Sequence, residues 1–232
     1  MESIYDDDED RKECRIFNFP VQMLSGIFEN KTKVIGEIAH YSVYKYSTQS
    51  TLYSELARFQ EAAEHLRVDF QNEEGAVMHG KELVQSTPDK CINVGLNARI
   101  FHEFALSHKT EFELACFCAF CAIKSWIGTK NYIKVCRNGI LRRMFWNDTE
   151  SELYKKYSTR YHFDKLITEL EVGNWHLKRN TGKSRGYYLS FKLSCEELTY
   201  IAKSKQKTSK IKELKEIKKQ VLQKVQKRIK AN

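Results

Sequence analysis

Hydrophobic residues recur at steps of three and four along most of the chain, which is the spacing of amphipathic helices. In the first half this spacing predicts a helix that begins at Pro20, a second helix over residues 33–46 and a third over residues 51–66. The third is the clearest of the three, because good helix formers separate its apolar positions. The pattern of the whole chain indicates a mainly α (α+β) fold, with strands expected chiefly toward the end.

The pattern is weaker between these helices and the middle of the chain. Residues 72–75 are typical of a turn, and Pro88 marks another interruption. Residues 94–106 fit either one helix or a strand followed by a helix. Because no set of side chains in residues 14–108 has the spacing of a catalytic site, the prediction for this part is a mainly helical N-terminal domain of unknown role.

A strongly apolar helix is predicted over residues 111–127, and Gly128 supplies its stop signal. A shorter helix follows around residues 140–145. Residues 147–149 then offer N-cap side chains for a helix that extends to Tyr157. The second half of the chain therefore opens with three helices in close succession.

Residues 160–172 form the most regular amphipathic helix of the second half. Thr159 is a suitable N-cap, and Gly173 is a stop signal. The apolar positions recur at i, i+3, i+4 and i+7 and form one buried face: Phe163, Leu166, Ile167 and Leu170. The remaining surface offers polar and aromatic side chains: Arg160, Tyr161, Lys165 and Thr168.

A β-hairpin is predicted directly after this helix. Residues 175–179 form its first strand, and residues 187–193 alternate apolar and polar positions as a half-buried second strand does. Between the strands, residues 180–186 form a polar loop with two glycines. Four cations lie at the end of the first strand and in this loop: Lys178, Arg179, Lys183 and Arg185.

Two helices, a turn, an amphipathic helix and a hairpin with a basic tip follow one another here, and this order resembles the winged-helix class, in particular domains of replication initiators and mobile-element regulators. The resemblance covers about residues 109–200 and rests on the order of the elements. In that class the third helix enters the major groove of DNA, and the wing contacts the backbone or the minor groove. The resemblance therefore implies DNA contacts by two sets of side chains: Arg160, Tyr161, Lys165 and Thr168 of the helix, and Lys178, Arg179, Lys183 and Arg185 of the wing.

Positive charge is concentrated in two parts of the sequence. Residues 158–192 contain seven cations and three carboxylates, a net charge of +4. Residues 203–232 contain twelve cations and only two carboxylates, a net charge of +10, so residues 1–202 sum to −1 in a chain of +9. This asymmetric distribution favours a polyanionic partner.

The C-terminal residues combine a linker composition with an amphipathic pattern. Residues 203–210 alternate lysine with serine, threonine and glutamine, which predicts a basic linker. From residue 211 the apolar positions step by three or four, which predicts a helix of about 18–20 residues with a narrow apolar stripe. Three interpretations stay open: contact with nucleic-acid backbone, pairing with a second copy in a homodimer, and binding to an anionic membrane surface. The stripe contains no tryptophan or phenylalanine, which disfavours the membrane.

The N-terminus and the distribution of apolar residues indicate a cytoplasmic protein. Residues 1–13 are polar and include five consecutive acids, so they are predicted to be an acidic, disordered leader. They do not have the basic and then apolar sequence of a signal peptide. No run of about 18 apolar residues occurs, so neither a membrane span nor a membrane partner is expected.

Neither an enzyme nor a cofactor is expected from the residue types that usually carry chemistry. The seven cysteines are an odd, scattered set, which is typical of reduced thiols. On a helix Cys116 and Cys118 point about 200° apart, so with Cys121 they are expected to be core residues and not metal ligands. Gly182-Lys183-Ser184 superficially resembles a phosphate-binding loop, but Leu177 stands where that motif has glycine.

These features favour a non-enzymatic nucleic-acid-binding protein, a transcriptional regulator or a replication-initiation factor that binds duplex DNA through residues 160–172 and 175–193. One alternative is a structural or adaptor protein, in which the winged helix and the C-terminal helix assemble proteins. Another is an RNA-binding protein, with Trp175, Tyr187 and Tyr188 as stacking platforms.

Overall fold

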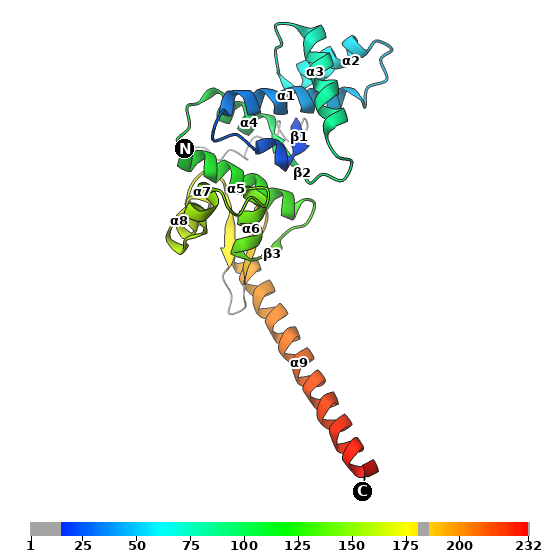
Figure 1. Cartoon of the computed structure of the whole chain (residues 1–232), viewed down its shortest axis with the longest axis vertical. Helices are drawn as coiled ribbons and strands as arrows, with labels where there is room; N and C mark the ends of the chain where they lie inside the picture. The colour runs from blue at the N-terminus through cyan, green and yellow to red at the C-terminus, as the bar shows by residue number, and fades with distance from the viewer. Residues whose placement is uncertain (1–14, 181–185, 232) are drawn as a thin grey trace.

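The computed structural model describes residues 15–180 and 186–231, and for parts of residues 207–231 it describes the backbone alone. Most of these residues are helical, and two small antiparallel sheets complete the structure. Figure 1 shows a body of two parts from which one long helix projects. The mainly α (α+β) fold class is confirmed at this level. The acidic leader expected at residues 1–13 lies outside the described residues.

The first part of the body is closed by a two-stranded sheet. Strand β1 (Ile16–Pro20) pairs antiparallel with β2 (Asn93–Asn97), so the chain returns to its starting point before it enters the second part. The other elements of this part are helical: η1 (Val21–Leu24), a 3-10 helix, and the α-helices α1 (Lys31–Ser47), α2 (Glu55–Leu66), α3 (Glu73–Ser86) and α4 (Ala98–Leu106). Helix α1 contacts both α2 and α3, and with β1 it forms the centre of this part.

Two of the helices expected in this part are present, as α1 and α2. The helix expected from Pro20 is present only as the four-residue 3-10 helix η1, and Pro20 itself ends β1. Helix α3 was not predicted at all. Of the two alternatives for residues 94–106, the strand followed by a helix is correct.

The missed elements depend on contacts that are distant in the sequence. Phe17 of β1 lies opposite Leu96 of β2, and both side chains are fully buried. Helix α3 contains Gly80, where an added Cβ would lie 2.8 Å from the carbonyl oxygen of His40 in α1. Glycine therefore lets α3 approach α1 closely, but it also weakens the helical signal of the sequence.

The second part of the body contains four helices and a three-stranded antiparallel sheet. The helices are α5 (Glu111–Ile127), α6 (Arg137–Met144), α7 (Glu152–Ser158) and α8 (Arg160–Val172). The strands are β3 (Ile133–Val135), β4 (Lys178–Asn180) and β5 (Tyr187–Ser190). In the sheet the order is β3-β5-β4, so the hairpin formed by β4 and β5 is joined to β3 through β5.

Local hydrogen bonds explain why some boundaries in this part differ from the prediction. Asp148 accepts hydrogen bonds from the backbone N–H groups of Glu150 and Ser151, and Ser151 caps α7, which therefore begins later than residues 147–149 indicated. The first hairpin strand also begins later, because His176 has a positive φ of 53° that breaks the extended backbone. Strand β5 ends at Ser190, whose Oγ accepts from two following N–H groups.

One continuous hydrophobic core joins the two parts of the body. Its buried side chains come from both sides of residue 108, where a boundary between two domains was expected. The rings of Phe104 in α4 and Phe117 in α5 stack with their centres 3.7 Å apart. Across the same junction, the indole N–H of Trp146 donates to the carbonyl oxygen of Val21 at 2.9 Å. The two parts are thus packed against each other, and α5 contacts both β2 and η1 of the first part.

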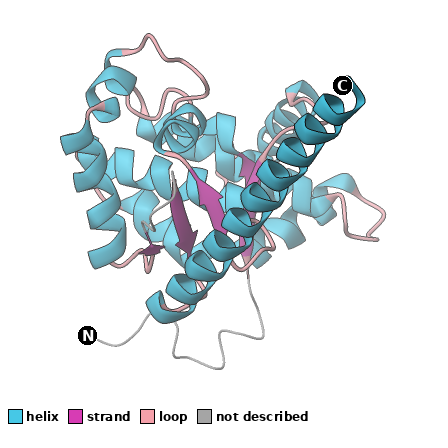
Figure 2. Ribbon diagram, turned by 90° about the horizontal axis from the view of Figure 1, so that it is seen from below, coloured by secondary structure: helices cyan, strands magenta, loops and turns pink. Residues whose placement is uncertain are grey.

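The C-terminal helix α9 (Cys195–Ala231) is a single element of 37 residues. It begins beside the sheet, where it contacts β4 and β5, and then projects away from the body, as Figures 1 and 2 show. The linker expected at residues 203–210 is helical in the structure, so that prediction was wrong. The sequence contains neither glycine nor proline between residues 195 and 231, and nothing in it therefore interrupts the helix.

Candidate nucleic-acid interface

Helix α8 is fixed on the body by one face and leaves the other face in solvent. Thr159 caps its N-terminus by accepting a hydrogen bond from the backbone N–H of His162, and the helix ends at Val172 as predicted. The four apolar side chains predicted for the inner face are all buried, in contact with α5 and α7. This packing fixes the direction in which the opposite face points.

The exposed face of α8 carries the four side chains that the sequence placed there. Arg160 and Tyr161 are strongly exposed, with 71% of the surface of Tyr161 open to solvent. Lys165 and Thr168 are also exposed, further along the helix. At about 100° per residue, Tyr161, Lys165 and Thr168 lie within about 60° of one another and form one stripe.

The two cations among these four side chains have neighbours that restrict their conformations. The Nε atom of Arg160 lies 3.5 Å from a carboxylate oxygen of Asp164, and this pair is exposed to solvent. The Nζ atom of Lys165 lies 4.8 Å from the centre of the Phe112 ring, a cation–π contact with α5. Both contacts are weak enough in water for the side chains to exchange them for a phosphate.

The structure describes two of the four predicted wing residues, and these two differ in their surroundings. Lys178 is half-buried and forms no ion pair with any described residue. Arg179 behaves differently, because its Nε and Nη2 atoms donate to the two carboxylate oxygens of Glu171 in α8, at 3.0 and 2.8 Å. Lys183 and Arg185 lie outside the described residues. Arg179 therefore connects the hairpin to α8 and is already neutralised there.

Strand β3 supports the hairpin and was not predicted. Ile133 lies opposite Leu189, and Val135 lies opposite Tyr187. Gly186 has a φ of 99°, and a Cβ at this position would lie 2.9 Å from the carbonyl oxygen of Val135. Glycine is therefore required where the loop passes close to β3. The alternation of residues 133–135 is a strand signal, but it is too short to stand out in the sequence.

The first turns of α9 are attached to the sheet on its β4–β5 side. Leu198 and Ala202 of the helix are buried against Tyr188 of β5. The side-chain amide of Asn180 donates to the hydroxyl of Thr199 at 2.8 Å. Helix α9 thus leaves the body from a defined place beside the hairpin, and its direction is fixed by that packing.

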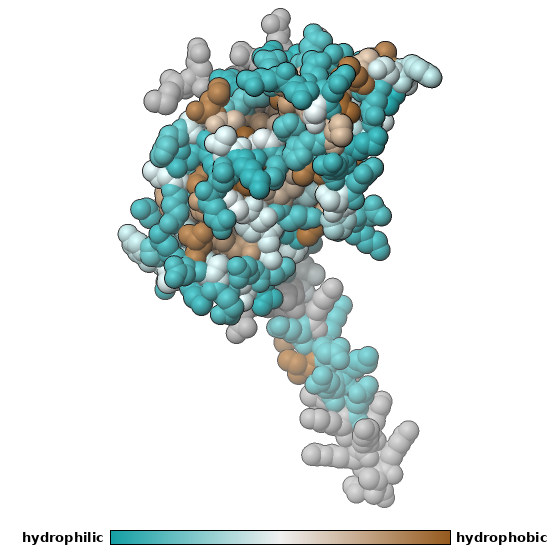
Figure 3. Space-filling model, turned by 45° about the horizontal axis from the view of Figure 1, so that its top comes forward, coloured by the Kyte–Doolittle hydropathy of each residue, from teal (hydrophilic) through white to brown (hydrophobic). Residues whose placement is uncertain are grey.

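Beyond this attachment α9 exposes a strongly basic surface. None of its described lysines takes part in an ion pair with a described residue, and these are Lys203, Lys205, Lys215, Lys218 and Lys219. Figure 3 shows that the described part of the helix is mainly hydrophilic, with one hydrophobic patch. Beyond Ala202, the described apolar side chains that are more than half exposed are Ile211, Leu214 and Ile217.

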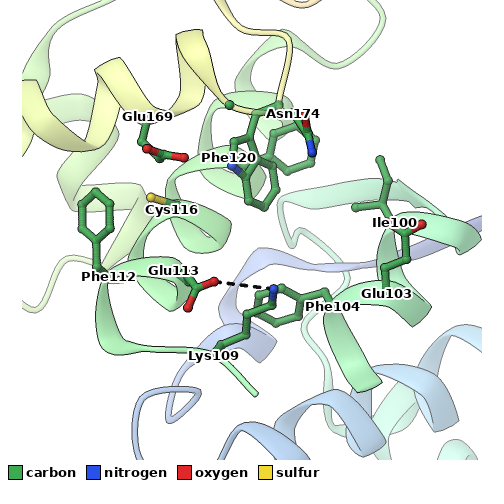
Figure 4. Close-up of a pocket in the computed structure, with 12 residues that line it drawn as sticks. Ile100, Glu103, Phe104, Lys109, Phe112, Glu113, Cys116, Phe120, Glu169 and Asn174 are labelled. Carbon is green, nitrogen blue, oxygen red and sulfur yellow. Dashed lines mark ion pairs between the residues drawn. The ribbon is translucent and has the colours of Figure 1, made fainter. Parts of the chain in front are cut away.

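A cavity of about 500 Å³ lies behind α8, between its C-terminal end and the helices α4 and α5 (Figure 4). Its charged lining consists of three carboxylates, from Glu103, Glu113 and Glu169, and the ammonium group of Lys109, which lies 3.8 Å from Glu113. Burial and the carboxylates of Glu169 and Glu113 raise the pKa of Cys116 to about 12, so this thiol stays protonated. Three carboxylates and one ammonium group make the lining of the cavity unsuited to phosphate, so the candidate interface is the outer face of α8 and the surface of α9.

None of the three proposed stacking platforms has an exposed side chain. Tyr188 is only 3% exposed, because it packs against α9. Trp175 is half-buried, and its ring centre lies 4.9 Å from that of Phe120. Tyr187 is half-buried beneath Arg179, whose guanidinium lies 5.9 Å from its ring centre. The described part of the hairpin therefore offers none of the exposed aromatic rings on which the RNA hypothesis would stack a base.

The cysteines of α5 belong to the core, as predicted. Cys116, Cys118 and Cys121 are at most 2% exposed. In the part of the chain that the structure describes, no group of three or more metal-ligating side chains converges. No described helix combines the length and the apolar character needed to cross a bilayer.

Comparison of the chain with protein-family models, with curated proteins and with solved structures gives no match. No function can therefore be carried over from a relative. The function has to be inferred from the geometry and the charge of the described residues.

Proposed function

We propose that residues 109–200 form a winged-helix domain that binds duplex DNA and that α9 adds sequence-independent attraction to the DNA backbone. The protein is then a non-enzymatic transcriptional regulator or replication-initiation factor. The observation that carries the proposal is the position of α8, which buries its apolar face and presents Arg160, Tyr161, Lys165 and Thr168 on an open surface. Arginine and lysine at such positions suit phosphates and guanine edges.

The order of the elements supports this proposal. A helix, a strand, further helices and a hairpin follow one another as α5, β3, α6–α8 and β4–β5, and β3 joins the hairpin in one sheet. In the winged-helix class the helix before the hairpin enters the major groove. Here that helix is α8, and Arg179 ties it to the hairpin through Glu171, which favours one rigid unit for docking.

The charge of α9 supports a second, different contribution. A helix of 37 residues is about 55 Å long, so its lysines extend well beyond the body. Lysines without intramolecular partners displace counterions from DNA when they meet its phosphates. This contribution does not depend on sequence, whereas the face of α8 is suited to direct contact with bases.

The experiment that tests the proposal is a titration of a fluorescent duplex with the full chain and with the variant Arg160→Ala/Lys165→Ala. We expect the variant to bind more weakly and its log–log salt slope to fall by about 1.8, since each lost phosphate contact accounts for about 0.9. Lys33→Ala/Lys45→Ala is the matched control, because both lysines are exposed on α1, away from the interface. Equal losses in the two double variants would contradict a role for α8, and tighter binding to single-stranded RNA than to duplex DNA would favour the RNA alternative.

One observation favours the adaptor alternative as a second candidate. Ile211, Leu214 and Ile217 form an exposed apolar stripe on α9, which is suited to contact with another protein or with a second copy of the chain. Sedimentation of the full chain over a range of concentrations tests this candidate. Self-association that is lost in Ile211→Gln/Leu214→Gln/Ile217→Gln, without any DNA binding in the parent, would place assembly ahead of DNA recognition.

A further inference from the structure

A second pocket, at the junction of the two parts of the body, has features that duplex binding does not use. Its volume is about 410 Å³, and it lies between the C-terminal end of α5, helix α6 and the segment after β1. Its polar and aromatic lining consists of Gln22, Trp126, Arg142, Arg143, Trp146 and Asn147. It therefore combines two guanidinium groups, two indoles and two amides, and it contains no carboxylate.

Arg143 is held in this pocket without an acidic partner. Its guanidinium carbon lies 3.9 Å from the ring centre of Trp126, and Nη1 donates to the hydroxyl of Ser125 at 3.2 Å. The side chain is half-buried, and this burial lowers its pKa. No carboxylate lies within ion-pair distance of it among residues 15–180 and 186–231. The C-terminal dipole of α5 compensates part of this positive charge, and an oxyanion bound in the pocket beside the two guanidinium groups would compensate the rest.

The backbone next to Arg143 is held in an unusual conformation. Trp146 and Asn147 have φ values of 50° and 66°, in the left-handed region that favours glycine. The N–H of Asn147 donates to the carbonyl oxygen of Arg142 at 2.7 Å and closes the end of α6. A tryptophan at this position is explained in part by its hydrogen bond to Val21. The same geometry makes its indole a fixed wall of the pocket, and strain of this kind is concentrated at functional sites.

The remaining polar side chains of the pocket are available to a ligand. The side chains of Gln22, Arg142 and Asn147 make no hydrogen bond or ion pair with any residue that the structure describes. Trp126 is 40% exposed, so its stacked pair with Arg143 can be reached from solvent. A planar ligand that stacks on an indole or a guanidinium and carries an oxyanion satisfies all of these groups at once.

We propose that this pocket binds a nucleoside phosphate, either as a free mononucleotide or as an unpaired nucleotide of a strand. The base stacks on the platform of Trp126 and Arg143, Arg142 pairs with the phosphate, and the amides of Gln22 and Asn147 meet the polar edge of the base. The volume is within the range of small-molecule sites, roughly 300–1,000 Å³. The inference is independent of duplex binding by α8, because it uses a different set of residues.

The test is calorimetric titration of the full chain with adenosine monophosphate, adenosine and ribose 5-phosphate at physiological salt. We expect adenosine monophosphate to bind at least tenfold more tightly than either fragment. Arg142→Gln should lower that affinity at least tenfold, since a charge-assisted contact is lost, and this residue is exposed, so the fold is retained. Trp126→Phe should weaken the binding of both adenosine and the nucleotide, but not that of ribose 5-phosphate.

Lys130→Gln is the matched control, because it removes one exposed cation outside the pocket. A 5′-phosphorylated trideoxyadenylate is titrated in parallel. If it binds with the same dependence on Arg142 while the mononucleotide does not, the site receives an unpaired nucleotide of a strand, and the proposal holds for that source. Absence of binding by both ligands at millimolar concentration, or equal affinities for Arg142→Gln and Lys130→Gln, would overturn the proposal.

Discussion

Two arginines of α8 and the hairpin are paired with carboxylates, whereas the described lysines of α9 are not. On the body, Arg179 donates to both carboxylate oxygens of Glu171, and Arg160 lies 3.5 Å from Asp164. On α9, the described lysines form no ion pair with any described residue. The body uses part of its positive charge to fix geometry, whereas the long helix leaves its charge for a partner.

This difference distinguishes two roles of positive charge, defined contact and general attraction, which the net charge of the chain does not distinguish. A side chain held by a neighbour in one position is suited to a contact of defined geometry. An exposed lysine on a projecting helix gives attraction that depends on salt and not on sequence. Substitutions that alter only the body or only the long helix should therefore have separate effects, and these effects should differ in size.

The largest effect is expected from removal of the α9 charges. In the full chain, replacement of five lysines of α9 by glutamine should reduce the log–log salt slope of duplex binding by about 4.5, since five phosphate contacts of about 0.9 each are lost. The positions are Lys203, Lys205, Lys215, Lys218 and Lys219. Fluorescence anisotropy at several salt concentrations measures the slope. Arginine at the same positions is the control and should keep it, and an unchanged slope in the glutamine variant would show that α9 does not meet DNA.

Arg179→Ala should affect stability more than binding. The substitution leaves Glu171 without its partner in a site where both side chains are less than a quarter exposed, which should cost about 1–3 kcal/mol. Thermal unfolding followed by circular dichroism measures this loss. Lys178→Ala is the matched variant, because Lys178 forms no ion pair with any described residue. We expect Lys178→Ala to weaken DNA binding and to change the melting temperature little. The reverse result would mean that Arg179, not Lys178, contacts the DNA.

The next effect in size is a gain in affinity for DNA, which we expect from Glu171→Gln. This change releases Arg179 for phosphate contact, and we expect roughly threefold tighter duplex binding together with a salt slope that is steeper by up to about 0.9. Glu169→Gln removes the same charge two residues away without releasing an arginine, so it separates the two effects. Equal gains in both variants would mean that the loss of one negative charge, and not the release of Arg179, explains the tighter binding.

The smallest effect is expected from Asp164→Asn on the exposed face of α8. The pair with Arg160 is open to solvent, and such pairs contribute about 0.2–1 kcal/mol. We expect at most about a twofold gain in duplex affinity and no measurable change in the melting temperature. A gain above tenfold in the same anisotropy titration would show that Asp164 weakens DNA binding by more than its exposed ion pair with Arg160 can explain.

The sequence predicted the elements whose signals are local. Helix α8 was placed with its observed bounds, because Thr159 caps it and its apolar positions follow the helical period up to Gly173. The exposed positions of the candidate site on α8 followed from the same period. For residues 94–106, a strand followed by a helix was predicted only as one of two alternatives, since a strand of five residues has too few positions to fix a period.

The elements and contacts that were missed depend on distant partners. Strand β1 is stabilised by β2, about 80 residues away, and its own sequence does not show this. The pair of Arg179 and Glu171 exists because the hairpin returns along α8, a consequence of the tertiary fold. The pocket around Trp126 and Arg143 joins three distant segments, so no sequence motif marks it.

The measurement that tests the central claim most directly is an anisotropy titration of a random duplex of about 30 base pairs, at about 0.05 and about 0.2 M salt. The full chain is compared with a chain that ends at Ala202, which keeps the buried Leu198 and Ala202 that attach α9 to the sheet. We expect the shorter chain still to bind in a salt-dependent way, with lower affinity and a shallower slope. Complete loss of binding in the shorter chain, with its melting temperature unchanged, would contradict recognition by α8 and leave only the attraction of the basic helix.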